Sequence, residues 1–490
     1  MKDIKFDFNN MFSTNIGGDH GVSVSEIAAM ADEIKTANLH FKSVLSNPKS
    51  RLNLAIEWTQ LPFQNRAAVK QIKDLGSEIN SKYENVLSLG IGGSYLGVKA
   101  AQDALAQVYY NEFKDLRKRR PKLYFEGNNL DPETLGVLLK ELNPKKTFVI
   151  VISKSGETTE TKAAFMVVED WLRKGVGKRF GRQIVAITDP QSGSLRKKVD
   201  AEQNKDPLSY RSLPLLKGVG GRFSEFNMGL LHLSIIGVDI QKVLDGAKAM
   251  FEKCSNDDVF KNPAYMYAVL HTILYKQKEK PIAILMPFSE TLKSTADWYV
   301  QLLAESLGKK YARRIEFVDG VSESWSRDTK KVVNCGRTPI SCRGTNDLHS
   351  IQQNNIEGEN NKVVTFIKVD KFRTDIKIPG SGDLLSGKKF SELIGLAQEA
   401  TEWALVRENR PNCNIIMPEI SPYYWGGLLF FFEMATAFEG ELLGVNAFDQ
   451  PGVEGYKNYM YYKLRKPGLS ENIVKEIESS QITKDQKFII

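Results

Sequence analysis

Short apolar runs alternate with helical stretches through the first half of the chain. The runs are NVLSLG from Asn85, KLYFEG from Lys122, TFVIVIS from Thr147 and QIVAITD from Gln183. Helical stretches such as DPETLGVLLKEL and TKAAFMVVEDWL separate them. Continuous apolar strands that alternate with helices are typical of a parallel sheet covered on both faces. Ligands of such sheets bind beyond the carboxyl ends of the strands.

A second pattern of the same kind begins near Pro281. The run PIAILMPF is followed by a predicted helix at about 291–307 and then by RRIEFVDG. The segment 361–380 alternates with the period of a strand, which favours an excursion or an edge hairpin. The other segments predicted from the pattern are helices at 390–408 and around 423–443 and a polar surface arm at 458–490.

The composition bounds the class of protein. With 490 residues, 42% hydrophobic and 26% charged, the chain has the composition of a soluble globular enzyme. Its first residues, MKDIKFDFNN, lack the apolar core of a signal peptide. The longest apolar run, 423–432, is far shorter than the ~20 residues of a membrane helix. Four cysteines without metal spacing favour a reducing, cytoplasmic setting. We therefore expect no membrane partner.

The formal net charge of +8 does not by itself indicate nucleic-acid binding. The one dense basic run, LRKRRPK at 116–122, has no interleaved aromatic residues and matches no nucleic-acid-binding module. A charge run of this kind is typical of a solvated surface. A basic balance also suits an enzyme that acts on anionic metabolites. We therefore expect no nucleic-acid partner.

The stretch GIGGSYLG, from Gly90 to Gly97, lies between a predicted strand and a predicted helix. Such a unit directs backbone N–H groups and a helix N-terminus toward an anion. The dinucleotide fingerprint would require glycine at Tyr95, and the Walker pattern would require lysine at Val98. The loop is therefore predicted to hold an anion that belongs to neither ligand class.

A cluster of hydroxyl groups follows the predicted strand 147–152. SKSGETT contains Ser153, Ser155, Thr158 and Thr159. Short neutral donors together with backbone N–H groups suit a phosphate monoester. The structural alternative is that one of the two threonines caps the following helix.

Other polar residues are weaker candidates when each is taken alone. In GVGGRFSEFN, two glycines would let Arg222 approach a ligand closely, although a structural salt bridge would explain it equally. Asp297, Gln301 and Glu305 share one helix face, which could be only the wet face. His349, in GTNDLHS, is a candidate acid–base group, although a surface histidine is commoner. The stretch 440–457 adds the polar residues Gln450, Glu454 and Lys457.

Six motifs together resemble those of the phosphoglucose isomerase family. They are GIGGSYLG, SKSGETTET, GVGGRFSEFN, LAESLGK, GTNDLHS and AFDQPGVEGYK, in the family's order and within about 55–460. The letters at 153–161 are more similar to the bacterial form of the family. The resemblance implies an α/β fold with two sugar-isomerase (SIS-type) doubly wound parallel-sheet domains of unequal size and a C-terminal arm. The implied parts are an N-terminal helical segment (1–54) packed on the large domain, a small domain (55–225), a large domain (226–440) and a C-terminal segment (441–490).

The resemblance also implies a reaction and a set of site residues. Members of the family interconvert glucose 6-phosphate and fructose 6-phosphate through ring opening and a cis-enediol, without a metal or cofactor. Glu305 would be the base, Arg222 would face the enediolate oxygen, and His349 and Lys457 would open the sugar ring. The implied substrate-binding residues are Gly93, Ser94, Ser153, Lys154, Ser155 and Thr158 at the phosphate and Gln301 and Gln450 at the sugar hydroxyls.

The family further implies a homodimer in which His349 comes from the neighbouring subunit. Two other functions compete with this interpretation. One is a bifunctional enzyme that also accepts mannose 6-phosphate, which differs only in the shape of the sugar pocket. The other is a non-catalytic sugar-phosphate-binding protein, which would have no need of Glu305, His349 and Lys457 together.

Overall fold

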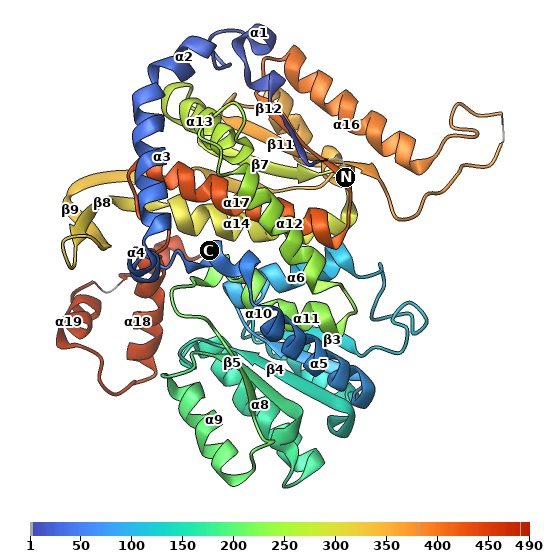
Figure 1. The fold of residues 1–490 in the computed structure, drawn as a ribbon, viewed down its shortest axis with the longest axis vertical. Helices are drawn as coiled ribbons and strands as arrows, with labels where there is room; N and C mark the ends of the chain where they lie inside the picture. Colours follow the sequence, from blue (N-terminus) through green and yellow to red (C-terminus); the bar gives the residue numbers. More distant parts are fainter. Residues whose placement is uncertain (1–2, 381, 481) are drawn as a thin grey trace. The chain divides into compact units, whose positions relative to one another are not determined.

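Two five-stranded sheets organise most of the chain (Figure 1). The computed structural model describes residues 3–380, 382–480 and 482–490. The chain divides into two compact units, Met1–Ala447 and Phe448–Ile490, and both sheets belong to the first. Since they lie in one unit, the domain boundaries expected at 54, 225 and 440 stay predictions.

The first sheet is parallel throughout, in the order β3-β2-β4-β5-β6. Its strands are β2 (Asn85–Leu89), β3 (Lys122–Glu126), β4 (Thr147–Ile152), β5 (Ile184–Thr188) and β6 (Arg211–Pro214). Every residue of β2, β4 and β5 is buried, as continuous apolar strands inside a parallel sheet must be. The four strands expected from the apolar runs are therefore confirmed.

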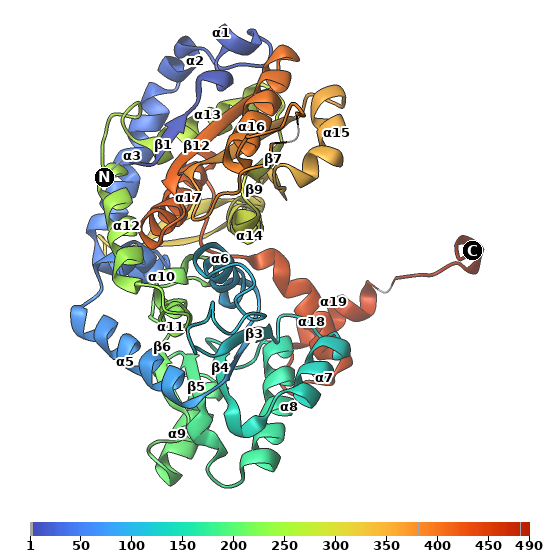
Figure 2. The same cartoon turned by 90° about the vertical axis from the view of Figure 1, so that its right-hand side faces the viewer.

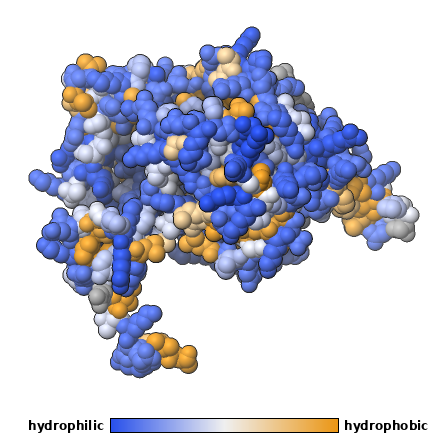
Figure 3. Space-filling view, turned by 90° about the horizontal axis from the view of Figure 1, so that it is seen from below, coloured by the Kyte–Doolittle hydropathy of each residue, from blue (hydrophilic) through white to orange (hydrophobic). Residues whose placement is uncertain are grey.

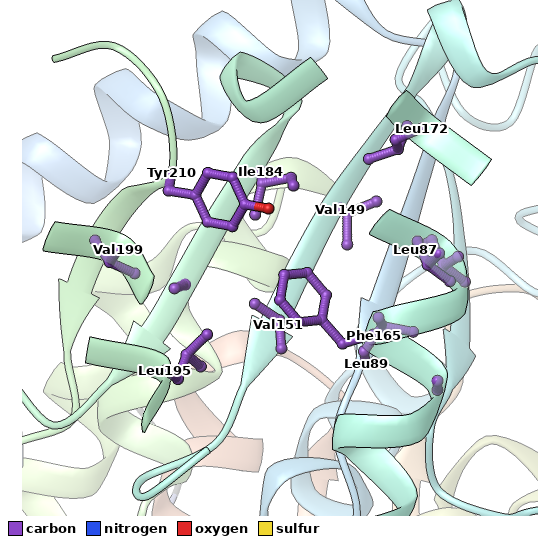
Figure 4. Packing of buried hydrophobic residues seen from close by; sticks show 13 residues of the cluster. Leu87, Leu89, Val149, Val151, Phe165, Leu172, Ile184, Leu195, Val199 and Tyr210 are labelled. Atoms are coloured by element: carbon purple, nitrogen blue, oxygen red, sulfur yellow. The ribbon is translucent and has the colours of Figure 1, made fainter. Parts of the chain in front are cut away.

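Helices cover both faces of this sheet (Figure 2). They are α5 (Arg66–Lys82) and α11 (Leu230–Ile235) on one face and α7 (Pro132–Glu141), α8 (Thr159–Val176) and α9 (Ser194–Lys205) on the other. In Figure 4, Leu87 and Val149 from the strands face Phe165 and Leu172 of α8, and Val199 of α9 lies on the same side. Alternate strand residues thus reach the helices of one face, as the pleat requires.

The second sheet has the order β1-β12-β11-β7-β10. Its strands are β1 (Lys5–Asp7), β7 (Ile282–Pro287), β10 (Thr338–Ser341), β11 (Lys362–Lys371) and β12 (Asn412–Glu419). Only β1 is antiparallel, at the edge beside β12. The edge hairpin considered for 361–380 is wrong in its first part, because β11 is an inner parallel strand and the excursion begins after it.

Helices also pack on both faces of the second sheet. The helices on one face are α15 (Gln352–Glu357) and α16 (Phe390–Arg407), and those on the other are α13 (Pro263–Gln277), α14 (Lys293–Leu307) and α17 (Pro422–Leu443). Tyr267 of α13 joins the strands through a hydrogen bond of 3.1 Å with Thr365 Oγ1. The prediction of two doubly wound sheets is therefore confirmed.

A long hairpin follows α14 and leaves the second sheet (Figure 1). Its strands are β8 (Lys309–Phe317) and β9 (Glu323–Cys335), which pair only with each other. The run RRIEFVDG therefore lies in this hairpin instead of adding a strand to the sheet. Arg313 of β8 donates to Glu441 at the end of α17, and His40, which lies outside the hairpin, contacts both Glu441 and Glu323 of β9.

The remaining helices of the first unit connect and cover these parts. They are α1 (Ser13–Ile16), α2 (Val24–Ala29), α3 (Ala31–Ser46), α4 (Pro48–Asn53), α6 (Leu96–Leu105), α10 (Glu225–Met228) and α12 (Ile240–Lys253). The apolar run 423–432 lies in α17, which is buried nearly all round and therefore forms the interior of the unit. None of the helices in the described residues has the length and apolar character needed to span a bilayer.

The α-helices of the second unit, among its described residues, are α18 (Glu454–Lys463) and α19 (Glu471–Ser479). Neither helix has a buried residue.

The face of the protein drawn in Figure 3 is mostly hydrophilic, with hydrophobic side chains in small groups. The interpretation of the tail as a surface arm stays a prediction.

Candidate active site

The predicted anion loop connects β2 to α6, with a short helical turn at Gly92–Ser94. Two of its glycines are required by close contacts. A Cβ atom on Gly93 would lie 2.2 Å from the carbonyl carbon of Gly221, and one on Gly92 would lie 3.0 Å from Nε2 of Gln301. Gly92 also has a positive φ of 57°. The glycines thus let the loop contact the segment that carries Arg222 and the helix that carries Gln301.

Arg222 lies on the helical turn Gly221–Phe223 and is 2% exposed. Each guanidinium nitrogen donates a hydrogen bond. Nε donates to Ser306 Oγ at 2.7 Å, Nη1 to Glu305 Oε2 at 3.1 Å and Nη2 to the Ala447 carbonyl at 2.6 Å. Because these partners come from α14 and from the segment after α17, the guanidinium is fixed in one orientation.

Glu305 is held from two sides near the end of α14. Gln301, one turn earlier, donates from Nε2 to Glu305 Oε1 at 3.2 Å, and Arg222 contacts the other oxygen. Gln301 Oε1 is buried and has no hydrogen-bond partner among the described residues. Asp297 instead pairs with Lys293 at 2.6 Å. Of the three polar residues on this face of α14, Glu305 contacts Arg222 directly and Gln301 is linked to Arg222 through Glu305, whereas Asp297 pairs elsewhere.

The hydroxyl cluster lies between β4 and α8, at the sheet edge where β2 also ends. Ser153 is buried, and its Oγ accepts a hydrogen bond from the Gly156 N–H at 3.0 Å. Ser155 Oγ accepts from the Glu157 N–H at 3.1 Å, and Lys154 is exposed. Thr158 occupies the N-cap position of α8, but its side chain makes no capping hydrogen bond. The capping alternative is therefore wrong for Thr158.

The structure does not join His349 to this group. His349 ends the helical turn Asn346–His349, after β10, and its side chain is exposed. That side chain makes no hydrogen bond or ion pair with any residue in the described part of the chain.

Lys457 and Gln450 belong to the second unit. Lys457 Nζ donates to Glu454 Oε1 at 2.9 Å within α18. Burial lowers the pKa of Lys457, but the hydrogen bond and charge of Glu454 outweigh it, so the pKa lies above its ordinary value. Gln450 is exposed and precedes the helical turn Pro451–Val453.

Several residues that support Arg222 were not expected from the sequence. Ser306 and Ala447 contact its guanidinium from positions far along the chain. Nearby in the sequence, Glu225 is buried, as is Glu433, and Trp298 Nε1 donates to Glu225 at 2.9 Å. Burial, and repulsion from Glu225 after it, hold the pKa of Glu433 well above the usual carboxyl range; burial also raises the pKa of Glu225. A glutamate within GGRFSEF is the only sequence signal for this pair.

The described residues contain no group of three His, Cys, Asp or Glu side chains that could hold a metal ion. The arrangement instead offers a carboxylate, a fixed guanidinium and a hydroxyl-rich loop. A carboxylate beside a buried cation can transfer a proton while negative charge develops nearby.

Comparison with known proteins identifies a family with these features. The family model described as "Phosphoglucose isomerase" matches residues 68–368 and 382–483. A glucose-6-phosphate isomerase of Carboxydothermus hydrogenoformans is 36% identical over 99% of both chains. A probable glucose-6-phosphate isomerase of Methanococcus maripaludis is 37% identical over 77% of this chain and 78% of its own.

Solved structures agree with this fold. A hypothetical protein of Thermus thermophilus superposes with a TM-score of 0.77, at 29% identity, over 94% of this chain and 100% of its own. A glucose-6-phosphate isomerase of Chlamydia trachomatis superposes with a TM-score of 0.69 over 86% of this chain and 80% of its own. At 22% identity, the second comparison concerns the fold alone.

Proposed function

The chain belongs to the phosphoglucose isomerase family, and from this premise we propose how its residues carry out the reaction. The protein is an aldose–ketose isomerase that interconverts glucose 6-phosphate and fructose 6-phosphate, a step of glycolysis and gluconeogenesis. The family does not favour a non-catalytic role or a second activity on mannose 6-phosphate.

The substrate phosphate binds at the edge of the first sheet. Ser153, Lys154, Ser155 and Thr158 hold it, with Gly93 and Ser94 of the neighbouring loop. Three observations support this assignment: β2 and β4 are adjacent, α8 begins at the cluster, and the Thr158 hydroxyl is not used as a cap. Backbone N–H groups and short hydroxyls can hold a dianion without a metal.

Glu305 carries the proton between C2 and C1 of the open-chain sugar. In the aldose-to-ketose direction, its carboxylate removes the C2 proton, the C–H electron pair forms the C1=C2 bond, and the carbonyl pair moves to O1. Glu305 then returns the proton to C1, where the C1=C2 electron pair forms the new C–H bond. The O2 hydroxyl gives its proton to O1, which becomes the C1 hydroxyl, and the O2–H electron pair forms the C2 ketone. A positioned acid–base group of this kind typically contributes ~10²–10⁴-fold to the rate.

Arg222 stabilises the charge that appears on the enediolate oxygen. Its guanidinium stays charged at every relevant pH, and Ser306 and Ala447 hold it in place before the charge develops. A fixed donor of this kind acts mainly on the transition state, because the ground-state sugar is neutral at C1 and C2. Gln301, whose amide oxygen has no partner among the described residues, accepts a hydrogen bond from a sugar hydroxyl. Gln450 also binds a sugar hydroxyl.

His349 and Lys457 open the ring by moving protons between O5 and the O1 hydroxyl. An exposed histidine with no partner in the described residues is available to a second subunit. We infer a homodimer in which His349 completes the neighbour's site. The four cysteines are unpaired, which supports a cytoplasmic location.

The observation that carries the proposal is the ion pair of 3.1 Å between the buried Arg222 and Glu305. A coupled assay tests the activity itself. Purified protein receives fructose 6-phosphate, NADP-linked glucose 6-phosphate dehydrogenase and EDTA, and NADPH is followed. We expect rapid NADPH formation that survives the chelator. Folded, dimeric protein that gives no NADPH would contradict the proposal, and a mannose 6-phosphate assay then tests the competing substrate.

A further inference from the structure

The two sheets repeat one chain path. In the first sheet the path is β2–α6–β3 followed by β4–α8–β5; in the second it is β7–α14–β10 followed by β11–α16–β12. In each sheet the first strand of this path lies between the second and third strands of the same path: β2 lies between β3 and β4, and β7 lies between β10 and β11. Helices α6 and α14 therefore hold equivalent positions, and they pack side by side (Figures 1 and 2).

This relation predicts a second cleft. The candidate active site combines the loop after β2 with the second half of α14, where Gly92 approaches Gln301. If the first and second sheets exchange roles, the equivalent place combines the loop after β7 with the C-terminal half of α6. A pocket of about 450 Å³ lies there, lined by Gln102 and Asp103 of α6 and by Glu290 and Thr291 after β7. Its volume is within the range of ligand sites, roughly 300–1,000 Å³.

An unused amide points to a ligand in this pocket. Gln102 lines the pocket and is only 8% exposed, yet its side chain makes no hydrogen bond with any described residue. The amide of Gln102 offers one acceptor and two donors to a bound molecule.

The other groups in the pocket decide the class of that molecule. Asp103 is paired with Lys99 at 2.5 Å, and Glu290 is paired with Arg343 at 2.6 Å. Each carboxylate occupies its own cation, so these pairs offer an anion no excess positive charge, and the loop FSETL after β7 contains no glycines to bring backbone N–H groups to a phosphate. Because both carboxylates already have cations, the pocket does not require a cationic ligand. Their remaining lone pairs can accept hydroxyl hydrogens.

We propose that this pocket is a second binding site, for a neutral polyhydroxyl molecule such as an unphosphorylated sugar. Its occupant is held by the Gln102 amide and the two carboxylates, and Phe125 and Tyr95 supply aromatic surface. Sites that combine aromatic walls with a few fixed polar groups suit such ligands. None of the residues proposed for the isomerase reaction is among those that line this pocket, although Tyr95 directly follows Ser94.

Saturation-transfer NMR tests the proposal with carbon-13-labelled D-glucose as the probe. Unlabelled glucose 6-phosphate and fructose 6-phosphate at equilibrium keep the active site filled. We expect transfer to the labelled glucose in the wild-type protein and in Gln301→Leu, and its loss in Gln102→Leu. Absence of transfer in the wild type would overturn the proposal, as would transfer that survives Gln102→Leu but disappears in Gln301→Leu.

A second measurement covers the case in which Gln102→Leu does not fold. Wild-type crystals are soaked in D-glucose together with the sugar phosphates. Density for the sugar beside Gln102 supports the site, and density at the active site alone contradicts it.

Discussion

Arg222 uses every nitrogen of its guanidinium inside the protein. Ser306, Glu305 and the Ala447 carbonyl each accept one or more of its hydrogens. Such a cation needs no rearrangement when an oxygen nearby becomes negative, which is how fixed donors lower a reaction barrier. The contact with Glu305 also places the positive charge beside the proposed base, so the charge and the proton are handled within one group of residues.

The buried carboxyl pair Glu225 and Glu433 makes stability depend on pH. Burial raises the folded-state pKa of both groups, whereas the unfolded chain ionises them in the ordinary range of about 4–5. The folded protein therefore binds more protons above that range. Its free energy of unfolding should fall as the pH rises.

Thermal melting between about pH 5 and 9 measures this effect in the wild type and in Glu225→Gln. We expect the wild-type midpoint to fall with rising pH and the Glu225→Gln midpoint to fall less, because the variant has one titrating group fewer. Glu392→Gln changes an exposed residue paired with Lys388 and should follow the wild-type curve. Parallel curves for Glu225→Gln and the wild type would mean that the pair does not hold a proton.

At the scale of residues, the sequence predicts the candidate site residues better than the residues that hold them in place. Arg222 and Glu305 stand in motifs that resemble a known family, Gln301 lies one helical turn before Glu305, and the structure brings these three together. Ser306 and Ala447 lie 84 and 225 positions from Arg222, and no local pattern links residues so far apart. Packing against a distant segment decides such contacts, so a single sequence does not show them.

At the scale of elements, three segments must approach each other closely: the loop after β2, the turn carrying Arg222 and the helix α14. Glycine makes this possible, because a Cβ atom on Gly93 would overlap the backbone of Gly221. The sequence predicts the loop, since four glycines follow an apolar strand. It does not predict the partner of the loop, which lies in a segment more than a hundred residues later.

Gly93→Ala should separate the loop from the Arg222 segment. We expect kcat/KM to fall by about 10²-fold or more, since a shift of about 1 Å in a catalytic group costs that much. Gly136→Ala is the matched control. Gly136 lies in the helix α7 with open space around it, so alanine there should stabilise the fold by about 0.5–1 kcal/mol.

Steady-state kinetics of both variants measures the expected loss of kcat/KM in Gly93→Ala, and thermal melting measures the expected stabilisation in Gly136→Ala. Equal activity in the two variants would show that the close contact at Gly93 is not needed for catalysis.

In the second sheet, the alternation of apolar and polar residues alone gives the wrong position for a strand. Residues 362–371 alternate like an edge strand, yet β11 lies between β7 and β12. Thr365 accounts for part of this pattern, because it is a buried polar residue that hydrogen-bonds Tyr267. A polar side chain with a buried partner looks like a solvent-facing position in the sequence. The run at 313–320 is likewise strand-like, but it pairs with β9 outside the sheet.

At the scale of the whole molecule, the proposed reaction requires two chains for each working site. His349 is exposed and has no partner among the described residues, whereas the proposed reaction gives it a role in ring opening. A dimer with two-fold symmetry would place one His349 at each of two sites. Subunits that carry different defects can test this directly.

Coexpression of Glu305→Gln and His349→Ala with different tags yields a mixed dimer. If His349 acts on the neighbour, one site has both defects and the other has none, so activity should return to about half of the wild-type value. If His349 acts within its own chain, each site has one defect and the mixed dimer stays as inactive as its parents. A dimer of two differently tagged Glu305→Gln chains serves as the control and should stay inactive.

In the proposed reaction, Glu305 transfers the proton between C2 and C1. The Glu305 side chain is 28% exposed, so its proton can exchange with solvent during the reaction. The measurement is deuterium incorporation at C2 of glucose 6-phosphate formed from fructose 6-phosphate in heavy water, for the wild type, Glu305→Gln and Asp297→Asn. Asp297 lies on the same helix face but pairs with Lys293, which makes it the matched control.

We predict that Glu305→Gln loses both turnover and incorporation by ~10²–10⁴-fold with KM nearly unchanged, while Asp297→Asn stays near the wild type. Incorporation at the wild-type rate in Glu305→Gln would contradict the account.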